Sequence, residues 1–321
     1  MATQLDQVNK VLLDNQDRDL HAALQRVITE NPALSDIVKE CILQLKMLVQ
    51  RNQITLDNPS IVRECSASAD KTALLIVDIQ NDFVTGSLRT DRCPARMDAM
   101  NIIKPINDLC RLAFKQIYVS KDWHPRDHVS FHENRNRWRL SKNSKIQDAE
   151  SAKIYDTITI IDSMGVECNQ QLWPTHCVAK SEGAKIHPNL MLPEDVIVIK
   201  KGTISDVESY SVFGDPKGRE DTTMETKLRA SGIKVLVVCG IAFDFCVAAS
   251  VMDASKRGYR VIVLEDACVG IDPAGIADAR KLMLESGVHI THSTKIPDIL
   301  SGNSTPLQHV LKWVHDQILD Q

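Results

Sequence analysis

A cysteine lies where the sequence predicts that a strand passes into a helix. The apolar run 235–239 predicts a buried strand, and a helix is expected to follow it and to end near Lys256. Cys246 lies between the two. A thiol at a helix N-terminus is near the positive end of the helix dipole and near unpaired backbone N–H groups, which favour its thiolate and can stabilise an oxyanion. Cys246 is therefore a candidate nucleophile, although buried cysteines more often act as small apolar side chains.

Charged residues lie at the ends of two other predicted strands. The run 73–77 is apolar and ends in Asp78, whose carboxylate needs a partner or a chemical task if it is buried. The alternative is an aspartate that caps a turn. Lys200 and Lys201 end the strand predicted near 196–200, and only one of them can face a given site because adjacent residues of a strand point to opposite faces. Such a lysine can favour a nearby thiolate, or can simply extend into solvent.

A third group has the donor types of a metal site. Asp122 and His124 follow the strand predicted at 116–120, and His176 lies in a later loop. Two neutral imidazoles and one carboxylate, with positions left open, suit a catalytic zinc, iron or manganese ion. The alternative is that these histidines cap loops or face solvent.

Composition narrows the classes of protein. The chain has 321 residues, 43% of them hydrophobic, which is ample for a large core. Its net charge of −4 gives no basic field, so nucleic acid is not expected as a partner. No apolar run is long enough to cross a bilayer, and we expect no membrane association. Nine cysteines without a C-x-x-C pair indicate free thiols in a reducing compartment, either the cytoplasm or the nucleus.

The elements that must position these residues fall into two parts. Residues 1–68 predict a small all-α module, with an apolar stripe at helical spacing between 37 and 49. From residue 72 to 321, short β-branched apolar runs alternate with helical stretches. This alternation predicts an α/β fold, a doubly wound and mainly parallel sheet with helices on both faces. Its strands are expected at 73–77, 116–120, 196–200, 234–238, 260–264 and 288–291. Ligands of such sheets bind beyond the carboxyl ends of the strands, where the polar residues above lie.

Five separated motifs resemble one family, the isochorismatase-like cysteine hydrolases, and among them the nicotinamidases. The motifs are VDIQNDF with Asp78, DWHPRDHVSF with Asp122 and His124, WPTHCV with His176, KKGTISDVESYSVF with Lys201, and GIAFDFCV with Cys246. They occur in the order of the family, and the resemblance covers residues 72–321.

The resemblance implies a role for each of these residues. Asp78, Lys201 and Cys246 correspond to a catalytic triad. Asp122, His124 and His176 correspond to metal ligands, and His128 matches a position that ligates the metal in some relatives and not in others. A cis peptide between Ile241 and Ala242 is implied, with the N–H groups of Ala242 and Cys246 as the oxyanion hole. Phe83, Trp173 and Tyr210 match aromatic residues that enclose a pyridine ring, and ordinary core packing is their alternative role.

The resemblance also implies the reaction. The expected activity is hydrolysis of nicotinamide to nicotinate and ammonia in NAD salvage, with one divalent metal ion that fixes the ring and polarises water. Zinc is the first choice, with Fe²⁺ and Mn²⁺ as alternatives, and a homo-oligomer is left open. Two other functions remain: a metal-independent amidohydrolase of the same superfamily, and a non-catalytic scaffold that binds through the helical module.

Two segments depart from compact members of the family. The N-terminal module occupies the position where some relatives carry an EF-hand-like extension. The acidic stretch 14–19 has neither the glycine at the sixth position nor the glutamate at the twelfth position of a calcium loop, so we expect no calcium site there. The segment 135–171 is long and polar, and its stretch 156–160 predicts an added strand or a lid.

Overall fold

The computed structural model describes residues 66–303 together with Pro306 and His309. The helical module predicted for 1–68 lies outside the described residues, apart from its last three positions. Free thiols were expected, and each of the seven cysteines in the described part of the chain is free.

A six-stranded sheet forms the centre of the molecule. Its strand order is β6-β2-β1-β7-β8-β9, and each neighbouring pair is parallel. The expected α/β class and parallel sheet are therefore confirmed. The strands are β1 (Thr72–Val77), β2 (Gln116–Asp122), β6 (Ile197–Lys201), β7 (Val235–Ile241), β8 (Arg260–Val269) and β9 (His289–Thr291).

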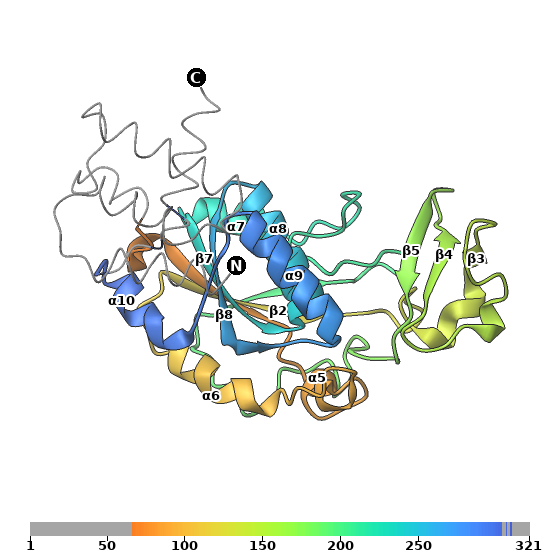
Figure 1. The fold of residues 1–321 in the computed structure, drawn as a ribbon, viewed down its shortest axis with the longest axis horizontal. Coiled ribbons are helices and arrows are strands. Elements are labelled where there is room, and N and C mark those ends of the chain that lie inside the picture. The colour runs from red at the N-terminus through yellow and green to blue at the C-terminus, as the bar shows by residue number, and fades with distance from the viewer. Residues whose placement is uncertain (1–65, 304–305, 307–308, 310–321) are drawn as a thin grey trace, which may run out of the picture.

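Helices cover both faces of this sheet. Helices α6 (Met100–Leu109) and α10 (Ile296–Leu300) lie on one face, and α7 (Met224–Ala230), α8 (Ala248–Lys256) and α9 (Pro273–Glu285) lie on the other (Figure 1). None of the helices in the described residues is long and apolar enough to span a membrane. Shorter elements are α5 (Asn81–Val84), η1 (Ala69–Lys71), η2 (Thr90–Arg92), η3 (His132–Arg137), η4 (Ala149–Ser151), η6 (Ser293–Lys295) and a π-helical turn, η5 (Phe243–Val247).

The central strands are apolar along their whole length because helices cover both of their faces. Every residue of β1 and of β7 is buried. Burying a Val, Leu or Ile side chain stabilises a fold by about 1.5–3 kcal/mol, so these two strands anchor the core. They also fix the positions of the residues that follow them.

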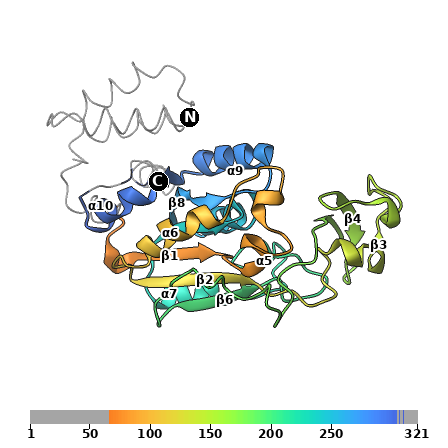
Figure 2. The same ribbon diagram turned by 90° about the horizontal axis from the view of Figure 1, so that it is seen from below.

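A second, antiparallel sheet is inserted between β2 and β6. It contains β3 (Arg139–Leu140), β4 (Thr157–Ile161) and β5 (Glu167–Gln171), and it lies to one side of the large sheet (Figure 1). We call the segment 129–172, which carries these strands, the insert, and the rest of the described chain the large domain. Strand β4 confirms the strand expected at 156–160. The insert has its own small apolar core of Val129, Ala152, Ile158, Ile160 and Leu172. The arrowheads of β1, β2 and β6 point toward it, so the insert lies at the carboxyl edge of the sheet (Figure 2).

Candidate active site

Four neighbouring strands deliver charged or nucleophilic residues to the same edge. Asp78 follows β1, Asp122 ends β2, Lys201 ends β6 and Cys246 follows β7. Because β6, β2, β1 and β7 are adjacent in the sheet, their carboxyl ends lie side by side. Residues separated by up to 168 positions in the sequence thus meet in one place, which is the edge where α/β proteins bind their ligands.

The ammonium group of Lys201 is the centre of this cluster. Its Nζ lies 2.9 Å from Asp78 Oδ2, 2.5 Å from Asp122 Oδ1 and 3.1 Å from Cys246 Sγ. Asp122 and Lys201 are direct partners in the pairing of β2 with β6, which explains their close contact. Lys200 points to the opposite face, where its ammonium lies over the ring of Trp123. Of the two lysines, Lys201 is therefore the one that faces the cluster.

Burial controls the protonation of the cluster. It raises the pKa of the Cys246 thiol well above its usual value, and the nearby Lys201 offsets only part of this effect. The sequence predicted that a helix terminus favours the thiolate, but burial acts against this effect: Cys246 lies in the π-helical turn before α8, where desolvation is the largest cause of the raised pKa of its thiol. Burial also raises the pKa of Asp78. Burial would lower the pKa of Lys201, but Asp122 and Asp78 raise it, and the amine stays charged.

Two features hold Asp78 in place. Ser120 donates its hydroxyl to Asp78 Oδ1 at 2.7 Å. Gly240 in β7 has a φ of +122°, and a Cβ at this position would lie 2.1 Å from the carbonyl oxygen of Val77. Only glycine therefore lets β7 approach the residue before Asp78.

Asp122, His124 and His176 form a second cluster next to the first. One possible ligand atom from each lies within 4.8 Å of the others. Asp122 Oδ2 is 3.5 Å from His124 Nε2 and 3.8 Å from His176 Nε2. His124 Nδ1–H donates to the carbonyl of Gly202 at 2.8 Å, and His176 Nδ1–H donates to that of Pro174 at 2.7 Å. Both Nε2 lone pairs are thus left to face the carboxylate.

This donor set fits a divalent metal ion. Backbone acceptors on Nδ1 are the usual way to orient a histidine that binds metal through Nε2. Burial and then the nearby His124 lower the pKa of His176 to about 4, so this ring is neutral near pH 7, as a ligand must be. Burial would lower the pKa of His124 as well, but Asp122 raises it, so a metal ion would have to displace a proton from this ring. Burial also raises the pKa of Asp122, but Lys201 and then His124 bring it well below its usual value, so the carboxylate is charged.

His128 is not part of this group. Its Nδ1 accepts from Ser130 Oγ at 2.7 Å, and its Nε2–H donates to the carbonyl of Val207 at 3.0 Å. With both nitrogens occupied, the ring instead stacks on His124 at a centroid distance of 4.0 Å. In this arrangement His128 packs against His124, and both of its nitrogens have protein partners.

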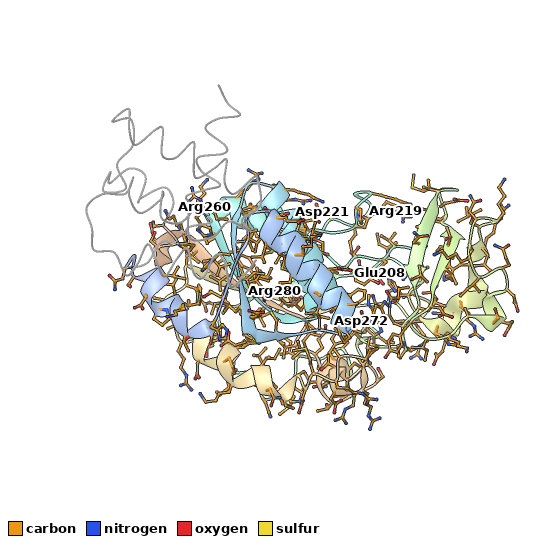
Figure 3. The ribbon with its side chains drawn as sticks, in the orientation of Figure 1. Glu208, Arg219, Asp221, Arg260, Asp272 and Arg280 are labelled. Atoms are coloured by element: carbon orange, nitrogen blue, oxygen red, sulfur yellow. The ribbon has the colours of Figure 1, made fainter. Side chains whose placement is uncertain are left out.

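A cavity joins the two clusters. It is small, with about 370 Å³ of space between its walls, part of which is open solvent. The aromatic residues expected from the sequence, Phe83, Trp173 and Tyr210, all line it. The other lining residues are Leu88, Asp122, His124, His176, Glu208, Ala242, Phe245, Cys246 and Ile271. Glu208 lies between the large sheet and the insert (Figure 3).

Several of these contacts were not predicted from the sequence. Phe245 packs edge-on against Trp173 with ring centroids 4.8 Å apart. Glu208 lines the cavity, and burial raises the pKa of its carboxyl group. Phe245 directly precedes the nucleophile and Glu208 lies in the motif of Lys201, so proximity to a motif was the available signal. The expected peptide between Ile241 and Ala242 is cis.

Two polar side chains that do not line the cavity support Asp122 and His124. Gln80 hydrogen-bonds both backbone groups of Asp122. Glu220 accepts from the backbone N–H groups of Gly202 and Thr203 at 2.8 and 2.7 Å, which fixes the loop whose carbonyl orients His124. Neither role is visible in the sequence, because each depends on a partner at least 17 positions away.

Comparison with known proteins gives a consistent match. Residues 72–295 match the family described as the isochorismatase domain. The nicotinamidase of Acinetobacter baylyi is 36% identical over 229 residues, which are 71% of this chain and 95% of that protein.

Solved structures show the same relationship. The nicotinamidase-pyrazinamidase of Acinetobacter baumannii superposes with a TM-score of 0.60 at 34% identity, covering 71% of this chain and 98% of the other. The pyrazinamidase of Pyrococcus horikoshii, solved in complex with zinc, gives a TM-score of 0.52 at 31% identity, covering 69% and 99%.

Proposed function

Because this chain belongs to the isochorismatase family, we infer from its site that it is a nicotinamidase, an enzyme that hydrolyses nicotinamide to nicotinate and ammonia. The observation that carries this inference is the contact of Lys201 with Asp78 and Cys246 beside the group of Asp122, His124 and His176. A metal-independent amidohydrolase would need the first cluster only. Relatives that match over most of their length bear the same activity in their names.

Cys246 is the proposed nucleophile and Asp78 the proposed base. Their reactive atoms lie within 4.8 Å of each other, with the Lys201 ammonium in contact with both. The high pKa of the thiol means that it enters the reaction protonated, so a base is required. The raised pKa of Asp78 suits that task, because a more basic carboxylate accepts a proton more readily. Lys201 stabilises the negative charge on either partner as the proton moves.

The thiolate then attacks the carboxamide carbon. The backbone N–H groups of Ala242 and Cys246 are the proposed donors to the oxyanion, and both residues line the cavity. Protonated Asp78 returns its proton to the amine, which leaves as ammonia, and a thioester remains on Cys246. Asp78 next removes a proton from a water molecule that attacks the thioester carbon. The C–S bond then breaks, the proton passes from Asp78 to the Cys246 thiolate, and nicotinate is released.

Asp122, His124 and His176 are proposed to hold one divalent metal ion, with zinc as the first choice. When bound, this ion supplies Lewis acidity toward water and a fixed ligand site for the pyridine nitrogen. The zinc complex of the Pyrococcus horikoshii relative supports that choice. The three side chains orient the site, since their own geometry is fixed by Gln80, Gly202 and Pro174.

Aromatic side chains are proposed to bind the ring. Phe83, Trp173, Tyr210 and Phe245 surround the cavity and offer apolar faces and edges to a flat heteroaromatic ring. These contacts do not distinguish pyridine from pyrazine, so pyrazinamide is a second expected substrate. The Acinetobacter baumannii relative is named for both activities.

The experiment that tests this function is product analysis. Purified protein incubated with nicotinamide should yield nicotinate and ammonia in equal amounts, and Cys246→Ala should yield neither. Cys177→Ala is the matched control, because Cys177 is also buried, but its Sγ donates to the carbonyl of Gly183 and packs in the apolar core. Full activity in Cys246→Ala, or loss in Cys177→Ala alone, would move the nucleophile away from Cys246.

A further inference from the structure

The insert contacts the wall of the cavity through the aromatic ring of Tyr155. This ring lies 5.7 Å from that of Trp173, centroid to centroid, at an interplanar angle of 81°. On its other side, Trp173 meets Phe245 at 4.8 Å and donates its indole N–H to Tyr210 Oη at 3.0 Å. Trp173 is thus held between the insert and the aromatic lining of the cavity.

The backbone around Tyr155 is fixed to the residue before Trp173. The N–H of Tyr155 donates to the carbonyl of Leu172 at 2.7 Å, and the N–H of Leu172 donates to the carbonyl of Asp156 at 2.9 Å. Tyr155 has a φ of +75°, an unfavourable value for a bulky side chain. Such a conformation persists only where surrounding contacts determine it, and the two hydrogen bonds to Leu172 do so here.

The hydroxyl end of Tyr155 has a second anchor. Its Oη lies 3.7 Å from Cys93 Sγ, just beyond η2 of the large domain. The ring is therefore held at both ends, by the backbone of the insert and by Cys93. Burial of Cys93 and of Trp173 is nearly complete, at 1% and 4% exposure, while Tyr155 is 37% exposed. A partly exposed Tyr155 ring thus packs against a nearly buried Trp173 ring.

Tyr155 does not itself line the cavity. It lies on an open groove outside, together with Ala152 and Pro174. Its ring reaches the lining of the cavity through its contact with Trp173.

We propose that Tyr155 is a positioning residue through which the insert sets the affinity for the aromatic ring of the substrate, by holding Trp173 against the cavity. This role rests on the proposed function. It predicts an effect on KM and little effect on kcat, because Trp173 contacts the proposed ring site while the reacting carboxamide lies at Cys246. The insert thereby acts as part of the binding site although it carries no catalytic residue.

The first test compares steady-state constants for nicotinamide. Tyr155→Ala should raise KM about three- to tenfold, since an aromatic edge contact of this kind changes a binding constant by roughly that factor. Its kcat should change by less than about twofold. Tyr155→Phe keeps the edge contact and should restore a KM near that of the wild type. Met164→Ala, an exposed position in the insert, is the control and should match the wild type.

If Tyr155→Ala does not fold, Tyr155→Leu serves instead, because leucine fills the space without an aromatic edge. The proposal predicts a rise in KM for this variant as well. An unchanged KM in a folded Tyr155→Ala or Tyr155→Leu protein would overturn the proposal. So would an equal loss of kcat in Tyr155→Ala and Tyr155→Phe.

A second readout needs no turnover. Acrylamide quenching of tryptophan fluorescence should increase in Tyr155→Ala, and this increase should disappear in the double variant Tyr155→Ala/Trp173→Phe. If the wild type releases no ammonia from nicotinamide, the proposed function fails while the quenching result still decides whether Tyr155 positions Trp173. Unchanged quenching in Tyr155→Ala would contradict the positioning role whatever the substrate.

Discussion

Replacing Gln80 with leucine should weaken metal binding without removing a proposed ligand. Gln80 is fully buried and lies two residues after Asp78. Its side-chain carbonyl accepts from the N–H of Asp122 at 2.8 Å, and its amide donates to the carbonyls of Asp122 at 2.8 Å and Ala184 at 3.1 Å. These bonds fix the backbone of Asp122, and with it the direction of the carboxylate.

The size of the effect follows from these contacts. Gln80→Leu leaves one backbone N–H and two carbonyls of the interior without their partner. Each buried polar group left unpaired costs about 1–3 kcal/mol, so we expect the free energy of unfolding to fall by about 3 kcal/mol or more. Loss of a group that orients a metal ligand typically weakens metal binding by about 10- to 100-fold. Because Gln80 orients one ligand of three, about tenfold is the expected loss.

The assay is competition for zinc against a chromophoric chelator, with urea unfolding of the chelated protein measured in parallel. Gln116→Leu is the matched control, because Gln116 begins the same strand, β2, and its amide donates to Asp195 at the opposite end from the site. The control should bind zinc as the wild type does. Wild-type zinc affinity in folded Gln80→Leu would refute the reasoning that the backbone of Asp122 is set by this side chain.

Three further predictions concern single contacts. A Cβ on Gly202 would lie 2.3 Å from the His124 ring, so Gly202→Ala should weaken zinc binding at least about tenfold in the same competition assay. Gly218 has a similar positive φ but open space around it, so Gly218→Ala should bind zinc as the wild type does. Lys201→Met leaves the buried carboxylates of Asp78 and Asp122 without their cation, so the free energy of unfolding measured in urea should fall by about 3–5 kcal/mol, and activity should vanish. A fall below about 1 kcal/mol would contradict the central role of Lys201. The hydrogen bond from Lys217 lowers the pKa of Asp162 from 3.8 to about 2. Because the pKa of Asp162 is lower in the folded state than in the unfolded state, the charged carboxylate stabilises the fold above pH 4, and this stabilisation is lost as the pH falls toward 2. Acid unfolding followed by circular dichroism should show that Asp162→Asn lacks this pH-dependent loss of stability.

Asp162 also shows how the insert is attached. It accepts from Lys217 Nζ at 2.9 Å and lies 3.5 Å from Arg219, and both basic residues belong to the loop between β6 and α7. Arg219 is labelled in Figure 3. The carboxylate thus joins the turn between β4 and β5 to the large domain. Its titration should therefore affect the insert before the rest of the fold.

The sheet was predictable because its strands are buried on both faces. Continuous apolar runs such as those of β1 and β7 carry their own signal, and their alternation with helices predicts the parallel order. Strand ends were less predictable. The sequence indicated an end near residue 264 for β8, but the strand continues to Val269, since Cys268 and Val269 pair with Gly240 and Ile241 across a register shift. The polar Glu265 and Asp266 hide this continuation.

The residues of the site were predictable where a strand end or a motif marks them. Asp78, Asp122, Lys201 and Cys246 were identified in this way, and the fold brings them together. The protonation of Cys246 was not predictable, because it depends on burial that only the packed structure creates. Contacts between segments far apart in the sequence, such as that of Gln80 with Asp122, were also not predictable.

Tyr155 shows the same limit in the insert. It lies in no motif and acquires its contact with Trp173 only when the insert folds against the large domain. A sequence pattern reports which residues are apolar or charged, but it does not report which surface of one segment will meet another. Residues that act through such contacts need the structure.

The measurement that tests the central claim most directly is ammonia release from nicotinamide by the wild type as purified, after chelation, and after zinc is restored, with Cys246→Ala measured alongside. The account predicts activity that disappears on chelation, returns with zinc, and is absent from Cys246→Ala under all three conditions. Ammonia release that survives complete metal removal, or that persists in Cys246→Ala, would contradict it.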